Sequence, residues 1–114
     1  MASNVNLTNK VYRNCGPVET TILTTLTTEK AAVVGLSLAN TTLQTVVVSV
    51  YVEDDSSTKG YYIKNLKIPA GGAARVVNGG EKLLLAPENS ITVISDTTNS
   101  IDAIVSFVLL TVTP

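Results

Sequence analysis

The sequence contains no histidine and no tryptophan, and Cys15 is the single cysteine among its 114 residues. Without histidine, neither a Ser-His-Asp nor a Cys-His nucleophile can be assembled, and histidine metal sites are excluded. One cysteine can form no intrachain disulfide, so the core must hold the fold together. We expect Cys15 to be an inert thiol in a bend, because no histidine is present to activate it. These absences predict a protein that is not an enzyme and has neither catalytic residues nor a cofactor.

Charge is also scarce. Charged residues make up 15% of the chain, whereas about 25% is typical of soluble domains. The net charge of −1 and the lack of a basic tract exclude direct nucleic-acid binding, which needs several lysines or arginines. The first ten residues do not have the pattern of a secretory signal, and no run of 18 apolar residues could span a bilayer. We therefore expect a chain made in the cytoplasm that binds no membrane and packs readily against neighbours.

Valine and threonine dominate what is present, with sixteen of each. Branching at Cβ favours strands over helices, and turn signals recur every 8 to 12 residues, a spacing typical of a sandwich. The length suits one domain. The sequence predicts an all-β fold, an antiparallel β-sandwich of about eight strands, either immunoglobulin-like or jelly-roll-like. Residues 1–10 lack a hydrophobic period and are interpreted as an N-terminal arm, with residues 11–114 as the single sandwich domain.

Two neighbouring segments show the clearest period of two. Large apolar residues alternate with small ones in residues 32–40, and four valines alternate with other residues in residues 44–53. We expect residues 40–43 to join these two strands as a hairpin turn. Farther along, the apolar phase of residues 61–68 switches near Lys64-Asn65, which predicts a β-bulge there.

Two Gly-Gly pairs in residues 68–82 raise the possibility of a phosphate-binding loop. Such a loop opens a helix after Gly-Lys-Ser/Thr, whereas Gly80 is followed by Glu-Lys-Leu and a predicted strand. Pro69 presets one corner of a turn and Gly71 or Gly72 supplies a positive φ, so we expect a type II-like turn here and a second turn at residues 78–80.

The acidic stretch at residues 53–60 has enough carboxylates to suggest calcium binding. No EF-hand spacing accompanies it, and a solvated hairpin tip explains it more simply. We therefore predict no metal site.

The last predicted strand, residues 101–112, is apolar on both faces. A strand of this kind needs cover on both sides. Its second face would be covered by another subunit, by a bend of the strand or by a returning loop. If a subunit covers it, the candidate interface residues lie in this strand and in the arm: Asn4, Val5, Leu7, Ile104, Val108, Leu110 and Val112.

Several segments together resemble small all-β virion proteins of tailed bacteriophages, including cyanophages. The resemblance covers residues 11–110 and is carried by the segments 34–42, 62–71, 80–85 and 88–93. It implies a structural protein of the virion, made in the host cytoplasm. The expected role is capsid decoration, in which the chain stabilises the head as a cement protein bound to the major capsid protein. Such proteins are commonly small homo-oligomers, with a trimer one possibility.

The alternative is a small tail, neck, baseplate or fibre component that binds a receptor or glycan. Its binding residues would lie on the loop tips at residues 53–59 and 96–100, because binding residues often sit on loops held by a rigid scaffold. A carboxylate hydrolase is disfavoured, since the sequence offers no separated acid pair in an expected cleft.

Overall fold

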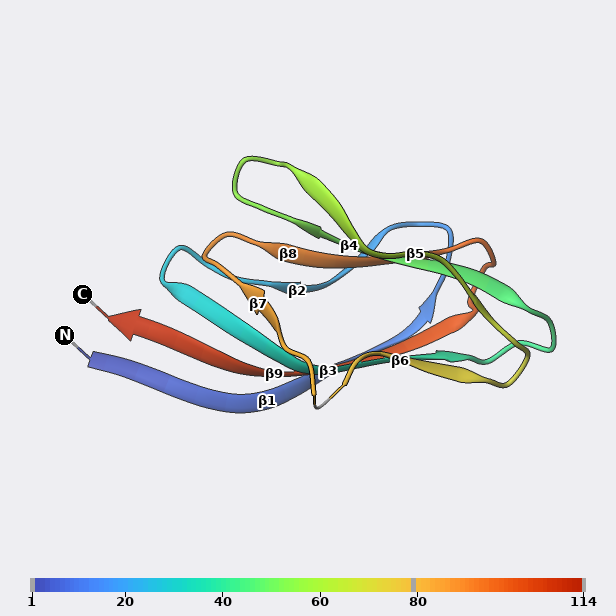
Figure 1. The fold of residues 1–114 in the computed structure, drawn as a ribbon, viewed down its shortest axis with the longest axis horizontal. Helices are drawn as coiled ribbons and strands as arrows, with labels where there is room; N and C mark the ends of the chain where they lie inside the picture. Colours follow the sequence, from blue (N-terminus) through green and yellow to red (C-terminus); the bar gives the residue numbers. More distant parts are fainter. Residues whose placement is uncertain (1, 79, 114) are drawn as a thin grey trace.

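The computed structural model describes residues 2–78 and 80–113, with side chains for residues 5–78 and 80–111. The described part contains nine strands and no helix (Figure 1). The strands are β1 (Ala2–Cys15), β2 (Thr20–Thr24), β3 (Glu29–Asn40), β4 (Val46–Glu53), β5 (Lys59–Ile68), β6 (Ala73–Val77), β7 (Leu83–Leu85), β8 (Ser90–Ser95) and β9 (Ile101–Thr113). The all-β prediction is confirmed.

The strands form two antiparallel sheets packed face to face. Sheet A has the order β1-β9-β3-β6, with β7 also paired to β3, and sheet B has the order β2-β8-β4-β5. Within the described residues, β4 and β5 are the only consecutive strands that pair with each other. Every other step along the chain crosses between the sheets, except the step from β6 to β7, which both pair with β3 in sheet A. This winding is that of a jelly roll rather than an immunoglobulin-like sandwich, and it decides between the two predicted forms.

The core lies between the sheets and follows the predicted period of two. In β4, Val46, Val48 and Val50 are fully buried, and in β3, Leu36 and Leu38 are buried as well. Phe107 on β9 is the largest of the fully or nearly fully buried side chains. These inward-facing residues exclude water from the space between the sheets, which is the main favourable term in folding.

The predicted hairpin at residues 40–43 is wrong. β3 lies in sheet A and β4 in sheet B, so this connection crosses between the sheets. The Asn40 side chain is buried and donates to the backbone carbonyls of Gln44, Ile68 and Pro69 at 2.8, 2.9 and 3.1 Å. The polar residues at 40–43 are compatible both with a crossing between sheets and with a hairpin turn within one sheet. The local sequence therefore could not distinguish these two connections.

The predicted bulge is confirmed. Val48 pairs with Leu66, whereas Val50 pairs with Ile63, so β5 carries one extra residue between these pairs. Asn65 has a φ of 56° there, and its N–H donates to Ser49 Oγ at 2.9 Å. Asparagine tolerates this left-handed conformation better than most residues.

Both predicted turns are present. Gly71 has a φ of 68°, and Gly72 N–H donates to the Pro69 carbonyl at 2.9 Å. Pro69 is thus the first residue of the turn rather than its corner. In the second turn, Glu81 N–H donates to the Asn78 carbonyl at 2.9 Å. Neither turn opens a helix, so the phosphate-loop reading has no structural support.

Residues 2–10, interpreted from the sequence as an arm, belong to β1. Each residue from Ala2 to Tyr12 lies opposite a residue of β9, beginning with Ala2 opposite Thr113. Because β9 extends as far as β1, it offers hydrogen-bond partners to the whole segment. The two termini therefore lie side by side at one end of an elongated molecule measuring 51 × 27 × 22 Å (Figure 1).

Candidate functional site

The outer face of sheet A, which points away from sheet B, collects exposed apolar side chains. In β9, Ile101, Ala103, Val105 and Phe107 are buried in the core, so the residues between them face outward. Residues directly opposite each other in a sheet share a face. Three outward residues of β9 lie opposite residues of β1: Leu110 opposite Val5, Val108 opposite Leu7 and Ile104 opposite Val11.

Strands β3 and β7 extend the same face. Leu84 of β7 lies opposite Ala32 of β3, which in turn lies opposite Val108. Leu7 and Leu84 leave 78% and 71% of their surface exposed. We define the apolar surface as these residues together: Val5, Leu7, Val11, Ala32, Leu84, Ile104, Val108 and Leu110.

A shallow groove of about 290 Å³ runs along the apolar surface near the termini. Its lining is almost entirely apolar, and the charged residue that borders it is Lys30, an exposed residue at the start of β3. The other half of the outer face is more polar, with a second hollow bordered by Ser37, Arg75 and Asn78. Large exposed apolar patches on a soluble protein mark interaction sites more often than single exposed residues do.

The structure brings five of the seven predicted interface residues onto this one face: Val5, Leu7, Ile104, Val108 and Leu110. The side chains of Asn4 and Val112 lie outside the described residues. No described bend or loop covers the face, since Val5, Leu7 and Ile104 remain exposed. Their role in an interface stays a prediction.

Sequence reasoning missed Val11 and Leu84. Val11 shares the odd-numbered phase of Val5 and Leu7, so the period of two could have identified it. Leu84 reaches the face through the pairing of β7 with β3, about fifty residues earlier in the chain. No local pattern reports such a pairing.

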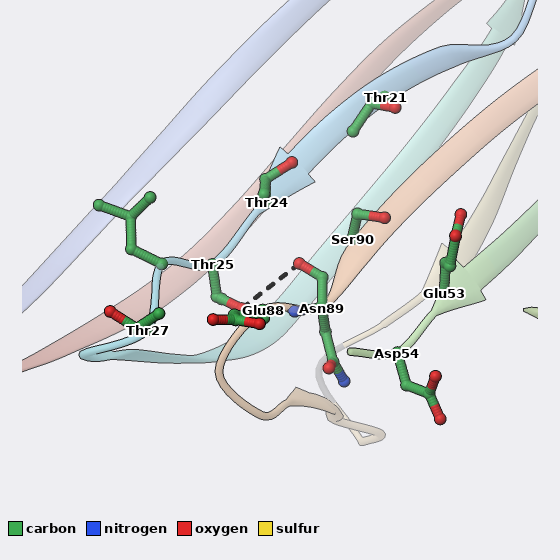
Figure 2. A pocket seen from close by; sticks show the side chains of 10 residues that line it. Thr21, Thr24, Thr25, Thr27, Glu53, Asp54, Glu88, Asn89 and Ser90 are labelled. Atoms are coloured by element: carbon green, nitrogen blue, oxygen red, sulfur yellow. Dashed lines mark hydrogen bonds between the residues drawn. The ribbon is translucent and has the colours of Figure 1, made fainter. Parts of the chain in front are cut away.

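A separate polar hollow of about 470 Å³ lies at the end of the sandwich where β2, β4 and β8 meet (Figure 2). It is lined by Thr21, Thr24, Thr25, Leu26, Thr27, Glu53, Asp54, Glu88, Asn89 and Ser90. The buried Thr25 hydroxyl donates to the Ala86 carbonyl at 2.7 Å and accepts from Asn89 N–H at 2.9 Å. These bonds hold the turn before β8 against the end of β2.

The best-placed carboxylate of this hollow takes part in a local turn. Asp54 accepts hydrogen bonds from the backbone N–H groups of Ser56 and Thr58, each at 2.9 Å, and so fixes its own turn. Among the described residues, no group of three or more potential metal ligands comes together. The predicted hairpin tip explains the acidic stretch.

The two loop tips proposed for receptor binding lie at opposite ends of the molecule. Glu53 pairs with Ser90 at the start of β8, whereas residues 96–100 follow its end. Figure 1 shows the first loop in green at one end and the second in orange at the other. The second loop is held internally, with Ser100 Oγ donating to the Thr97 carbonyl at 2.7 Å and lying 2.8 Å from Ser95 Oγ. The two tips therefore cannot form one site.

Two buried titratable side chains, Cys15 in the core and Tyr51 on the outer side of sheet B, have structural roles. The Cys15 thiol is buried, and desolvation raises its pKa, which agrees with an inert thiol. The Tyr51 hydroxyl donates to the Glu19 carboxylate, and this hydrogen bond raises the pKa of Tyr51. Lys59 lies 5.1 Å from the centre of the Tyr51 ring, within cation–π range.

The described part of the chain contains no helix of the length and apolarity that membrane crossing requires.

No family model matches the sequence, and no curated protein matches it either. Among solved structures, the chain is similar to a protein of Bacillus endospore appendages, described as a novel family of disulfide-linked pili. The TM-score is 0.59 at 8% identity, over 98% of this chain and 89% of that one.

Two structures from infectious bursal disease virus are similar as well. A chain of the T13 viral particle gives a TM-score of 0.52, and the D431N mutant of VP2 in derived T=1 particles gives 0.53, both at 10% identity. The alignments cover 96% of this chain but only 35% and 32% of the viral chains. At such low identities the likeness shows the fold alone.

Proposed function

We propose that this chain is a structural subunit of an assembled particle, and specifically a capsid decoration protein of a tailed bacteriophage. It binds the major capsid protein through the apolar surface, stabilises the head and takes part in no catalysis. The observation that carries this proposal is the row of exposed apolar side chains on the outer face of an otherwise weakly charged sandwich.

The mechanism is burial of surface across the joints between capsid subunits. Each Å² of apolar surface removed from water contributes roughly 25 cal/mol before the entropy of association is subtracted. Leu7 and Leu84 are the best anchors, because each projects most of its side chain into solvent from a rigid strand. The resemblance to phage virion proteins supports the choice of particle. The shared fold with a pilus protein and a viral particle protein supports the more general assembly role.

Thermal disruption of particles tests the proposal. Heads reconstituted with the chain are expected to open at a higher temperature than bare heads, and equal disruption temperatures would contradict a cement role. Leu7→Ser is expected to weaken head binding by about tenfold, the effect of losing ~1.4 kcal/mol at an interface. Leu43→Ser is the matched control, since Leu43 is 98% exposed but lies on the connection between β3 and β4, and it should bind as the wild type does.

A tail or fibre component that binds a receptor or glycan is the second candidate, and the polar hollow favours it. Threonine hydroxyls and carboxylates line it (Figure 2), and such groups hydrogen-bond to sugar hydroxyls. Glycan-array binding that disappears in Thr24→Val, together with no binding to heads, would replace the first proposal with this one.

A further inference from the structure

Strand β1 presents an edge that nothing in the described structure covers. It forms one margin of sheet A and pairs only with β9. The register is unbroken over eleven consecutive residues, from Ala2 to Tyr12, and shifts only between Tyr12 and Cys15. Apart from the pairing with β9, no backbone hydrogen bond of the described chain involves residues 2–13. Every second residue of this edge therefore offers an unpaired N–H and C=O to solvent.

The other sheet margins carry the features that prevent edge-to-edge pairing. β5 contains the bulge at Asn65 and three exposed lysines, Lys59, Lys64 and Lys67. β2 has five residues and a register shift, and β6 and β7 have five and three residues. Bulges, lysines and short strands are the usual protections of an edge.

β1 lacks these protections. Between Ala2 and Tyr12 it has one charged residue, Lys10, and no proline, glycine or bulge. A long regular edge without such features is a template for another strand.

We propose that β1 pairs antiparallel with β1 of a second copy across a two-fold axis at Thr8, so that the sheet A of each copy continues into the other. In such a pair, residue i faces residue 16 − i of the second copy, so odd-numbered residues face odd-numbered ones. Facing residues share a side of the sheet. The apolar surface of one copy, with Val5, Leu7 and Val11 at its margin, thus continues into that of the other.

Side-chain chemistry favours this register. It places Val5 opposite Val11 on both sides of the axis, Thr8 opposite Thr8, and Lys10 opposite Asn6. Apolar β-branched pairs and threonine pairs across strands are stabilising, and no like charges meet. An axis at Leu7 would set each valine against a polar residue. An axis at Asn6 would set Val5 against Leu7 but would place Val11 opposite residue 1, outside the described strand. The net charge of −1 gives little repulsion between copies.

This pairing deepens the proposed function, because a two-fold pair would offer a capsid joint one continuous apolar surface from two copies. The use of the pair at a capsid joint rests on the proposed function, whereas the pairing itself does not. The tests below use the purified chain without particles, so a failure of pairing and a failure of head binding are seen separately.

Sedimentation of purified chains with opposite charges at the axis tests the pairing. The wild type is expected to be a dimer, whereas Thr8→Lys and Thr8→Glu are each expected to be monomeric because like charges meet at the axis. Mixing the two variants should restore a dimer. A cooperative thermal unfolding transition in each variant would show that both fold, which Thr8 allows because it is exposed.

A cysteine at the axis gives a second readout. Thr8→Cys is expected to form a disulfide-linked dimer on mild oxidation, since the Cα atoms of facing residues lie about 4.5–5.5 Å apart, within the range that a disulfide spans. Lys64→Cys, on the protected edge of β5, is the control and should form the same dimer without a disulfide link. A monomeric or trimeric wild type, Thr8→Lys dimers as stable as the wild type, or the absence of cross-linking at Thr8 would each overturn the proposal.

Discussion

Single polar residues hold the places where the backbone of this sandwich departs from regular strands. Asn40 closes the crossing from sheet A to sheet B with three hydrogen bonds to backbone carbonyls. Asn65 occupies the left-handed conformation at the bulge of β5. Both residues belong to the scaffold, and their substitution should change stability rather than binding.

Substitution at Asn65 tests this role. Asn65→Val is expected to lower the free energy of unfolding by about 1–2 kcal/mol, because the left-handed conformation disfavours a residue branched at Cβ. Asn65→Gly should remain close to the wild type. Urea denaturation of both variants measures the difference, and equal losses for valine and glycine would contradict a conformational cause.

The buried thiol of Cys15 predicts a pH dependence. Its raised pKa means that the folded chain keeps a proton which the unfolded chain releases near the ordinary pKa of 9.0. The folded state then binds more protons, so the free energy of unfolding falls as pH rises above that value, until the folded pKa is passed. Tyr51 and Tyr62 have raised pKa values as well, so they lower the free energy of unfolding in the same way from about pH 10 upward.

Denaturation at a series of pH values measures this effect. The free energy of unfolding of Cys15→Ala is expected to fall less steeply between about pH 8.5 and 10 than that of the wild type, because the variant lacks the thiol. Parallel pH profiles would show that the thiol does not contribute. Comparing slopes rather than single values removes the effect of the smaller side chain on packing.

At the scale of elements, the alternation of apolar residues along a strand could be predicted from the sequence, whereas the pairing of one strand with another could not. The two-faced pattern of residues 101–112 and the bulge near Asn65 could be predicted, because each follows from the order of apolar residues along one strand. The crossing at residues 40–43 and the place of Leu84 could not. In a jelly roll most partners are far apart in sequence, so the local pattern does not specify them.

Hydrogen exchange of β1 tests its state as an element. In the Thr8→Lys chain, amides of β1 should alternate between slow exchange, where they bond to β9, and fast exchange, where they face outward. In the wild type the outward amides should be slow as well, because the second copy binds them. The amides of β5, the protected edge, should alternate between slow and fast exchange in both the wild type and Thr8→Lys, so β5 serves as the internal control. Alternation of β1 in the wild type at dimer-forming concentrations would contradict pairing.

At the scale of the whole molecule, the shape and charge suit assembly through contact. The molecule extends 51 Å along its longest axis, the termini lie together at one end, and charged residues make up 15% of the chain. The composition gives the low charge. It could not predict that five of the candidate contact residues would lie on one face, because this depends on the pairing of β1 with β9.

Association through the apolar surface predicts a weak response to salt and a distinct response to temperature. Contacts without ion pairs are little screened, so the affinity for heads should change little between low and physiological ionic strength. Burial of apolar area should give a negative heat-capacity change of binding, which calorimetry at several temperatures measures. A steep loss of affinity with salt would indicate an electrostatic interface instead.

Electron cryomicroscopy of virions that carry the chain would show which face of the molecule touches the particle. The outer face of sheet A, with Leu7, Leu84 and Val108, is expected to be buried against neighbouring subunits, while the polar hollow is expected to be open to solvent. A subunit whose outer face lies in solvent and whose polar hollow or 96–100 loop makes the contacts would contradict this expectation.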